Sequence, residues 1–217
     1  MKQQLSVSLE TGYFRPLVFL LMAEIFLSGC ASTGQSDPAG SVQAEEGVGF
    51  TVTEEVRVGS ELQTDYQLAL RHLEQGRHEQ GVALLEKVAD RTPSFSAPRI
   101  DLGVEYARAG DLEAARRHLL LALQANPSHP VTHNELGIVY RKLGRFDDAR
   151  RSYESALEIF SGYHHARRNL AILCDLYLSD MDCALRNYEA YLAAVPEDGD
   201  ASMWIADIRS RIQQEAN

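Results

Sequence analysis

The most reactive side chains of this chain belong to its three cysteines, Cys30, Cys174 and Cys183. Cys174 and Cys183 lie on either side of a predicted turn between two helices. Helices joined by a short turn run antiparallel, so the two thiols can approach bonding distance where the compartment is oxidising. The sequence leaves two alternatives open: a disulfide between Cys174 and Cys183, or two small buried residues that fill the contact between the helices.

No other pattern of reactive residues indicates catalysis. The sequence contains no phosphate-cradling glycine loop, no nucleophile elbow and no His-Glu-x-x-His signature. His129 and His133 are four positions apart, but a proline at a predicted helix start separates them, so we interpret both as capping or surface residues. His164 and His165 are neighbours, which point in different directions on a helix, and we expect them at the surface. We therefore predict a protein without enzymatic activity, metal, cofactor or small-molecule substrate.

The composition is that of a globular protein and argues against a nucleic-acid partner. The chain has 217 residues, of which 45% are hydrophobic and only 8% aromatic, which suits helices packed through alanine and leucine. Its formal net charge is -10 and it has no block of lysine and arginine. Binding to phosphates depends on clustered positive charge, so we expect no nucleic-acid partner.

An internal sequence repeat indicates which secondary-structure elements position the cysteines and histidines. Two stretches of the chain carry matching residues at a constant interval, which is the distance in sequence from Gly103 to Gly137. The matching pairs are Leu102-Gly103 and Leu136-Gly137, Tyr106 and Tyr140, Gly110 and Gly144, Ala115 and Ala149, and Ala122 and Ala156. The same interval continues on both sides, with one extra residue in the turn of the last unit. The sequence thus predicts four units, at residues 62–95, 96–129, 130–163 and 164–197.

Each unit has the pattern of a helical hairpin. Two stretches per unit place apolar residues three or four positions apart, as amphipathic helices require. A glycine in the middle of the first three units can adopt the left-handed conformation that ends a helix, and a proline stops the second helix of three units. These residues are Gly76, Gly110 and Gly144, and Pro93, Pro127 and Pro196. Ser60 with Gln63 predicts a capping box at the start of the first helix.

The spacing of Leu-Gly, tyrosine, alanine and proline within each unit resembles the tetratricopeptide repeat (TPR) family. The resemblance implies an all-α fold, a helical-hairpin solenoid over residues 61–197 with about four repeats. Residues 198–217 carry an apolar stripe and are expected to form the capping helix that such an array needs at its end. The stripe consists of Ala201, Trp204, Ile205, Ile208 and Ile212.

The N-terminal residues 1–29 are interpreted as a secretory signal peptide. The apolar run that begins at Leu17 is too short to span a bilayer and suits the core of such a signal. Its end, Leu27-Ser28-Gly29-Cys30, resembles the lipobox of bacterial lipoproteins, which implies cleavage before Cys30 and lipidation of its thiol. Ala31 and Ser32 after the cysteine imply an outer-membrane location facing the periplasm, by the sorting habit of that family. Glu24 is a charged residue within the apolar run and departs from the pattern of a signal peptide.

Residues 30–60 are expected to form the lipidated N-terminus and a flexible linker, because residues 31–49 are rich in serine, glycine and alanine. Within the linker, residues 50–58 alternate with the two-residue period of a strand, although no second strand is evident nearby. Two alternatives remain open for this segment: a poorly ordered lead-in, or an extended segment that docks on the helices. In the second case it could occupy the protein's own groove, with Glu54 and Glu55 near the groove arginines.

The TPR resemblance also implies a concave groove, lined by the first helix of each hairpin, that grips an extended peptide or a partner helix. The family's groove positions map onto Tyr66, Leu70, Ile100, Val104, Asn134, Ile138, Arg141, Arg168 and Ile172. Leu70, Val104, Ile138 and Ile172 recur at the repeat interval and suit an apolar peptide, unless they pack between adjacent repeats. Nearby cations are expected to hold acidic groups of the partner; they are Arg108, Arg141, Lys142 and Arg168.

Together these features predict a lipid-anchored periplasmic adaptor that helps to assemble an envelope complex. Its layout resembles the pilotins that bring type IV pilus secretins to the outer membrane, which carry more repeats than the four counted in this sequence. The alternatives are an adaptor for peptidoglycan hydrolases or proteases, and an accessory of a TonB-type system.

Overall fold

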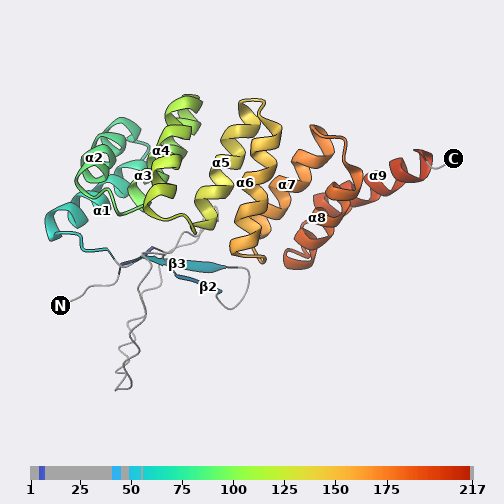
Figure 1. The fold of residues 1–217 in the computed structure, drawn as a ribbon, viewed down its shortest axis with the longest axis horizontal. Helices are drawn as coiled ribbons and strands as arrows, with labels where there is room; N and C mark the ends of the chain where they lie inside the picture. Colours follow the sequence, from blue (N-terminus) through green and yellow to red (C-terminus); the bar gives the residue numbers. More distant parts are fainter. Residues whose placement is uncertain (1–4, 8–40, 45–48, 55, 216–217) are drawn as a thin grey trace, which may run out of the picture.

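The computed structural model describes residues 5–7, 41–44, 49–54 and 56–215. These residues form nine α-helices and three short strands (Figure 1). The helices are α1 (Ser60–Glu74), α2 (His78–Arg91), α3 (Ala97–Ala109), α4 (Leu112–Ala125), α5 (Pro130–Lys142), α6 (Phe146–Ile159), α7 (His164–Leu176), α8 (Met181–Ala194) and α9 (Gly199–Glu215).

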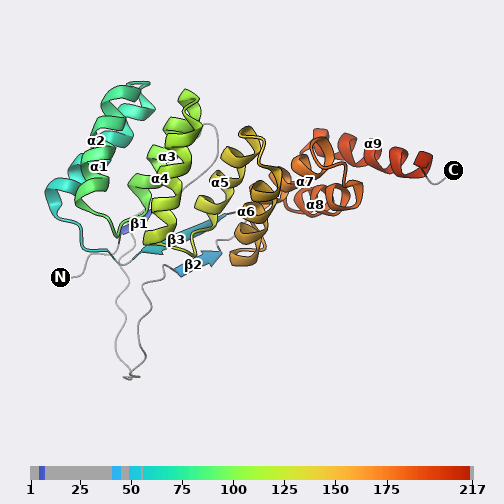
Figure 2. The same ribbon diagram turned by 45° about the horizontal axis from the view of Figure 1, so that its top comes forward.

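The first eight helices form four antiparallel hairpins that stack side by side in a row (Figures 1 and 2). Each hairpin packs its two helices against one another, and its second helix packs on the first helix of the next hairpin. Contacts also join α3 to α5 and α5 to α7, so the first helices approach each other along one side of the stack. This arrangement confirms the predicted helical-hairpin solenoid and gives the first helices a common face.

Close contact between the two helices of a hairpin depends on small residues. A Cβ atom added to Gly103 would lie 2.5 Å from the side chain of Leu119, and one added to Gly137 would lie 2.4 Å from the ring of Tyr153. Both neighbouring side chains are fully buried, so neither has free space to move into. The glycine of each Leu-Gly pair is therefore needed for packing in the second and third hairpins.

The turns within the hairpins differ between the first three units and the fourth. Gly76, Gly110 and Gly144 have φ values of 73°, 88° and 73°, which confirms their predicted left-handed conformation. In the fourth hairpin the corresponding position, after the extra residue, is Ser179 with φ 53°. A residue with a Cβ atom adopts this region at a cost in energy.

The C-terminal helix α9 covers the end of the stack. Ile205 and Ile208 are buried in a cluster with residues of α8, Ala201 is also buried, and the ring of Trp204 lies 5.2 Å from the ring of Tyr188. The apolar stripe predicted from the sequence is thus the face that α9 presents to the last hairpin.

A small antiparallel sheet precedes the helices, and its strand order is β1-β3-β2. The strands are β1 (Leu5–Val7), β2 (Ser41–Ala44) and β3 (Phe50–Glu54), with Val52 opposite both Val7 and Val42. The expectation that β3 lacks a nearby partner strand was wrong, because four residues of the predicted linker pair with it across a short connection. β1 lies within the predicted signal peptide, so cleavage before Cys30 would leave the pair of β2 and β3.

The predicted capping box at Ser60 was also wrong. The N-cap of α1 is Gly59, whose carbonyl accepts the backbone N–H of Gln63, and no side chain caps this end of the helix. The helix thus begins one residue earlier than that motif requires. Among the helices of the described residues, none combines the length and apolarity needed to cross a membrane.

Candidate peptide-binding groove

The candidate groove is the face formed by the first helices of the hairpins, α1, α3, α5 and α7. The nine residues predicted to line it all lie on these four helices: Tyr66, Leu70, Ile100, Val104, Asn134, Ile138, Arg141, Arg168 and Ile172. They fall mainly into two rows that recur once in every repeat, one at position 66 and its equivalents and one at position 70 and its equivalents. The two rows lie at different depths.

The row at position 66 lies too deep to contact a partner along most of its length. Tyr66, Ile100 and Asn134 are only 5%, 2% and 2% exposed, and only Arg168 at the end of the row is partly accessible. The first three side chains therefore form the floor of the face. Their role is to support the residues above them.

The row at position 70 is the accessible aliphatic part of the face. Leu70, Val104, Ile138 and Ile172 are each half-buried. Leu70 packs against the core of the first two hairpins, while Ile138 and Ile172 pack against the core of the last two. Leu70, Ile138 and Ile172 thus contribute part of their surface to the core, and all four side chains leave part of their surface open to a partner.

Beside the aliphatic row, on the side away from position 66, lies a polar row that the sequence analysis missed. Its members, Gln67, Asp101, Glu135 and Asn169, also recur once in every repeat, and this periodicity is the signal that would have revealed them. Tyr66 donates its hydroxyl proton to Asp101 Oδ2 over 2.7 Å, and Asn169 Nδ2 donates to Asn134 Oδ1 over 2.9 Å. These bonds join neighbouring first helices, so the row links one repeat to the next.

The carboxyl groups of this row have raised pKa values. Burial raises the pKa of Asp101 to about 6, the nearby Glu105 adds to the rise, and the hydrogen bond from Tyr66 opposes it. Burial also raises the pKa of Glu135, whose Oε1 accepts a hydrogen bond from Asn134 Nδ2 over 3.1 Å. The face therefore offers carboxyl and amide groups that can bind the backbone amides of an extended peptide.

The arginines expected to hold acidic groups of a partner are already engaged within the protein. Arg108 Nη1 donates to the buried Glu105 over 2.6 Å. The guanidinium of Arg141 lies 5.7 Å from the centre of the Tyr177 ring, and that of Arg168 lies 5.2 Å from the Trp204 ring. Their charges remain on the face, but each is held in place by a neighbouring carboxylate or ring.

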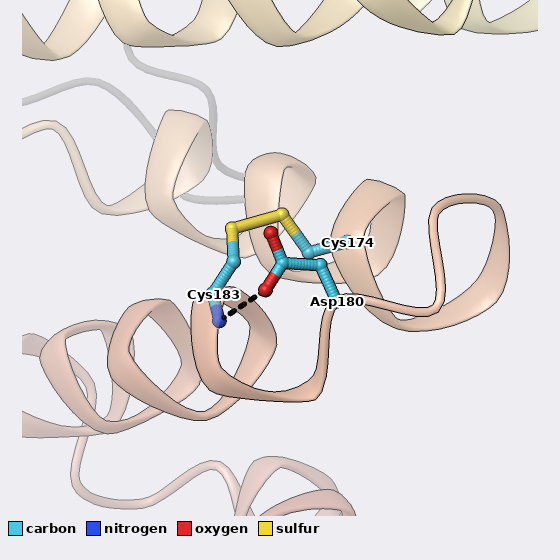
Figure 3. Close-up of side chains that lie close together, drawn as sticks. All are labelled: Cys174, Asp180 and Cys183. Carbon is cyan, nitrogen blue, oxygen red and sulfur yellow. Dashed lines mark hydrogen bonds between the residues drawn. A yellow bond between two sulfur atoms is a disulfide. The ribbon is translucent and has the colours of Figure 1, made fainter.

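Cys174 and Cys183 are joined by a disulfide between α7 and α8, with their Cα atoms 5.9 Å apart (Figure 3). The carboxylate of Asp180 lies beside them, and the possible ligand atoms of the three residues lie within 4.8 Å of one another. Asp180 accepts hydrogen bonds from the backbone N–H of Cys183 over 3.0 Å and from Arg150 Nη2 over 2.8 Å. In this state the cluster is a cross-linked and capped helical turn, because neither sulfur is a thiolate.

The histidines occupy structural positions. His129 is the N-cap of α5 and its Nδ1 accepts the backbone N–H of Thr132 over 3.4 Å, while His133 Nε2 lies 2.9 Å from the carbonyl oxygen of Pro127. The expectation that His164 and His165 point apart on the surface was wrong: both are half-buried and their ring centres are 4.0 Å apart. Burial lowers the pKa of His164 to about 4, and the adjacent His165 contributes to the lowering.

The predicted lipidation residue, Cys30, lies outside the described residues. Of the strand-like segment, Glu55 also lies outside the described residues, and the described residues dock away from the groove arginines. Glu54 is bound by Ser96 and Asn126, in the turns between repeats. The proposed placement of this segment in the protein's own groove is therefore incorrect.

Two family models for the tetratricopeptide repeat match the chain, one over residues 66–130 and the other over residues 129–197. The chain belongs to the TPR family. Its fold is accordingly that of a scaffold for protein–protein interaction, a class whose members generally lack enzymatic activity. A search of the curated proteins finds no sequence that matches this chain.

Solved TPR structures share the fold over most of the chain. A thermophilic TPR protein from Thermus thermophilus is 28% identical, with a TM-score of 0.58, and the match covers 69% of this chain and 81% of that one. MamA from Desulfovibrio magneticus RS-1 is 17% identical, with a TM-score of 0.65 and coverage of 72% and 88%. PilF from Pseudomonas aeruginosa is 19% identical, with a TM-score of 0.63 and coverage of 70% and 69%. The last two likenesses concern the fold alone.

Proposed function

We propose that this TPR protein is a lipid-anchored adaptor that grips an extended peptide or a partner helix on the face of its first helices. The observation that carries the proposal is the pairing of two periodic rows on that face. The half-buried row Leu70, Val104, Ile138 and Ile172 offers apolar contacts, and the row Gln67, Asp101, Glu135 and Asn169 offers hydrogen bonds to a peptide backbone. A ligand that follows both rows meets the same chemistry in every repeat.

The cellular context of the proposal rests on the sequence of the N-terminus. The lipobox-like end at Cys30 supports attachment to the outer membrane, with the solenoid in the periplasm and a linker that keeps it near the membrane. The layout supports a role in assembling an envelope complex, such as the type IV pilus secretin.

Site-specific crosslinking in the envelope tests the groove. A photo-reactive residue in place of Ile138, which lies in the apolar row, is expected to crosslink to a partner protein. The matched control is the same replacement at Met203, which is 63% exposed on α9 and lies outside the rows. Equal crosslinking from both positions would contradict a specific partner in the groove.

Fractionation tests the anchor separately. Changing Cys30→Ser removes the thiol that lipidation requires, so we expect the protein to move from the membrane fraction to the soluble fraction. Retention of the Cys30→Ser chain in the membrane fraction would overturn the lipoprotein assignment and leave the groove assignment untouched.

A further inference from the structure

The turns that join successive repeats form one edge of the solenoid, which we call the turn edge. It consists of residues 92–96, 126–129 and 160–163, between the second helix of one repeat and the first helix of the next. Strand β3 lies along this edge, beneath the ends of the central helices (Figures 1 and 2). Its contacts there involve residues far away in the sequence, from Ser96 to Tyr163.

One end of β3 places a carboxylate in a polar pocket. The side chain of Glu54 is only 8% exposed, and it accepts hydrogen bonds from the backbone N–H of Ser96 over 3.1 Å, from its hydroxyl over 2.5 Å and from Asn126 Nδ2 over 2.6 Å. Ser96 is the N-cap of α3, and its side chain makes no capping bond to its own helix. The carboxylate thus also lies at a helix N-terminus, where the helix dipole favours negative charge.

The other end of β3 places an aromatic ring between two others. The centre of the Phe50 ring lies 4.7 Å from that of Phe160 and 4.9 Å from that of Tyr163, which are ordinary distances for aromatic pairs. Phe50 and Glu54 are four residues apart in a strand, so their side chains project to the same side, roughly 13 Å apart. Val52 lies between them and is 6% exposed.

The turn edge is built to recognise one register of an extended segment. A slip of one residue would turn the carboxylate away from Ser96 and Asn126, which are 0% and 2% exposed. Without a carboxylate, the buried donors of Ser96 and Asn126 would lose these partners, which is costly in a buried position. A strand held by apolar contacts alone would not need buried hydrogen-bond donors on this edge. The polar pocket therefore contributes more to selecting the sequence of the ligand than to the strength of its binding.

We propose that the turn edge is a second ligand site, for an extended segment with an aromatic residue followed four positions later by a glutamate. In this structure the protein's own β3 fills the site. A partner strand with the same pattern fills it when β3 is displaced. The short connection from β3 to α1, residues 55–59, gives β3 a high effective concentration, so the partner must compete with it.

A peptide-binding experiment on the full chain tests this proposal. The probe is a fluorescently labelled peptide with the sequence of residues 48–56, VGFTVTEEV. A chain with Phe50→Ala and Glu54→Ala has an unoccupied site and is expected to bind the probe at least about tenfold more tightly than the unchanged chain, because charged hydrogen bonds are among the stronger ones. Replacing the first glutamate of the probe by glutamine should weaken its binding by about tenfold.

Two further variants keep the result interpretable. Glu54→Gln alone preserves the shape of β3, and we expect it to raise binding of the probe several-fold even if the double variant folds poorly. Ile138→Glu alters the groove, and a folded chain with this change should bind the probe as the unchanged chain does, which separates the turn edge from the proposed adaptor groove. Equal binding to the unchanged and unoccupied chains, or binding that ignores the glutamine exchange, would overturn the proposal.

Discussion

The second and fourth repeats have the same helical hairpin, but they hold their turns together in different ways. In the second repeat Gly110 supplies the left-handed turn residue, and Tyr106 stacks on His118 with ring centres 5.2 Å apart. In the fourth repeat Ser179 adopts a positive φ, and a disulfide joins the two helices. Its cysteines stand at the positions that Tyr106 and Ala114 occupy in the second repeat, allowing for the extra residue.

The caps of the second helices show what the two turns still share. Asp111 accepts the backbone N–H of Ala114 over 2.9 Å, and Asp180 accepts that of Cys183 over 3.0 Å. Both second helices thus keep an aspartate cap. The fourth repeat lacks the turn glycine of the second repeat and has a disulfide between its two helices instead. The comparison indicates that the fourth hairpin depends on its disulfide in the way the second depends on its glycine.

Removing the disulfide should have the largest effect. We expect Cys174→Ala with Cys183→Ala to lower the free energy of unfolding by about 2–3 kcal/mol, because the unfolded chain regains the entropy of an open loop. Trp204, the sole tryptophan, packs on Tyr188 of α8, so its fluorescence reports on this region during urea unfolding. The double variant should not respond to a reducing agent, whereas the unchanged chain should lose similar stability in it. A reducing agent without effect on the unchanged chain would contradict a stabilising disulfide.

The polar row of the groove differs between the same two repeats, with Asp101 in the second and Asn169 in the fourth. Since burial raises the pKa of Asp101 to about 6, its stabilising contribution is present below its unfolded pKa and is lost as the pH rises through about 6. We expect Asp101→Asn to raise the free energy of unfolding by about 2 kcal/mol at neutral pH, with the gain shrinking as the pH falls toward the unfolded value.

Urea unfolding of the unchanged chain and of Asp101→Asn across that pH range measures this difference. The buried histidines, whose stabilising contribution changes with pH in the opposite direction, are present in both chains and cancel in the comparison. The reverse exchange, Asn169→Asp, is the matched control and should destabilise the fourth repeat at neutral pH. A gain from Asp101→Asn that does not change with pH would show that the carboxyl has the same pKa in the folded and unfolded chains, and would contradict its raised pKa.

Replacing Gly110, the turn glycine of the second repeat, should have the next largest effect on stability. We expect Gly110→Ala to lower the free energy of unfolding by about 1–2 kcal/mol, because the left-handed conformation brings the new Cβ close to the following carbonyl oxygen. Space does not limit this substitution, since nothing lies within 4 Å of the added atom. Urea unfolding followed by circular dichroism measures the loss, and an unchanged midpoint would contradict the conformational argument.

The smallest effect is expected from the converse exchange in the fourth turn. Ser179→Gly should raise the free energy of unfolding by about 0.5–1 kcal/mol, because glycine adopts the positive φ of this position without steric cost. Ser179→Ala is the control and should leave stability nearly unchanged, as both residues carry a Cβ atom. A loss of stability in Ser179→Gly would indicate that the disulfide has already removed the advantage of glycine.

The sequence predicted the repeated hairpins well because their determinants are local and periodic. Gly76, Gly110 and Gly144 mark three turns, and the structure gives all three a positive φ. The groove was predicted less well. Family positions identified its helices, but Tyr66, Ile100 and Asn134 proved to be buried, since the depth of a side chain depends on how closely neighbouring first helices approach.

The start of the first helix and the strands were predicted poorly for a different reason. Ser60 has the residue type of a cap, but the N-cap of the helix is Gly59 and no side chain caps this end. β3 has a strand pattern, but its partners are set by pairings and contacts across long stretches of chain, which no local pattern reveals.

The sequence by itself determined the number of repeats, the positions of their turns and the helical face that each apolar row occupies, because the constant repeat interval fixes these locally. Only the tertiary structure decided the burial that raises the pKa of Asp101, the joining of Cys174 to Cys183 and the docking of Glu54 between Ser96 and Asn126. Each of these depends on groups that become neighbours only when separate helices and turns pack together.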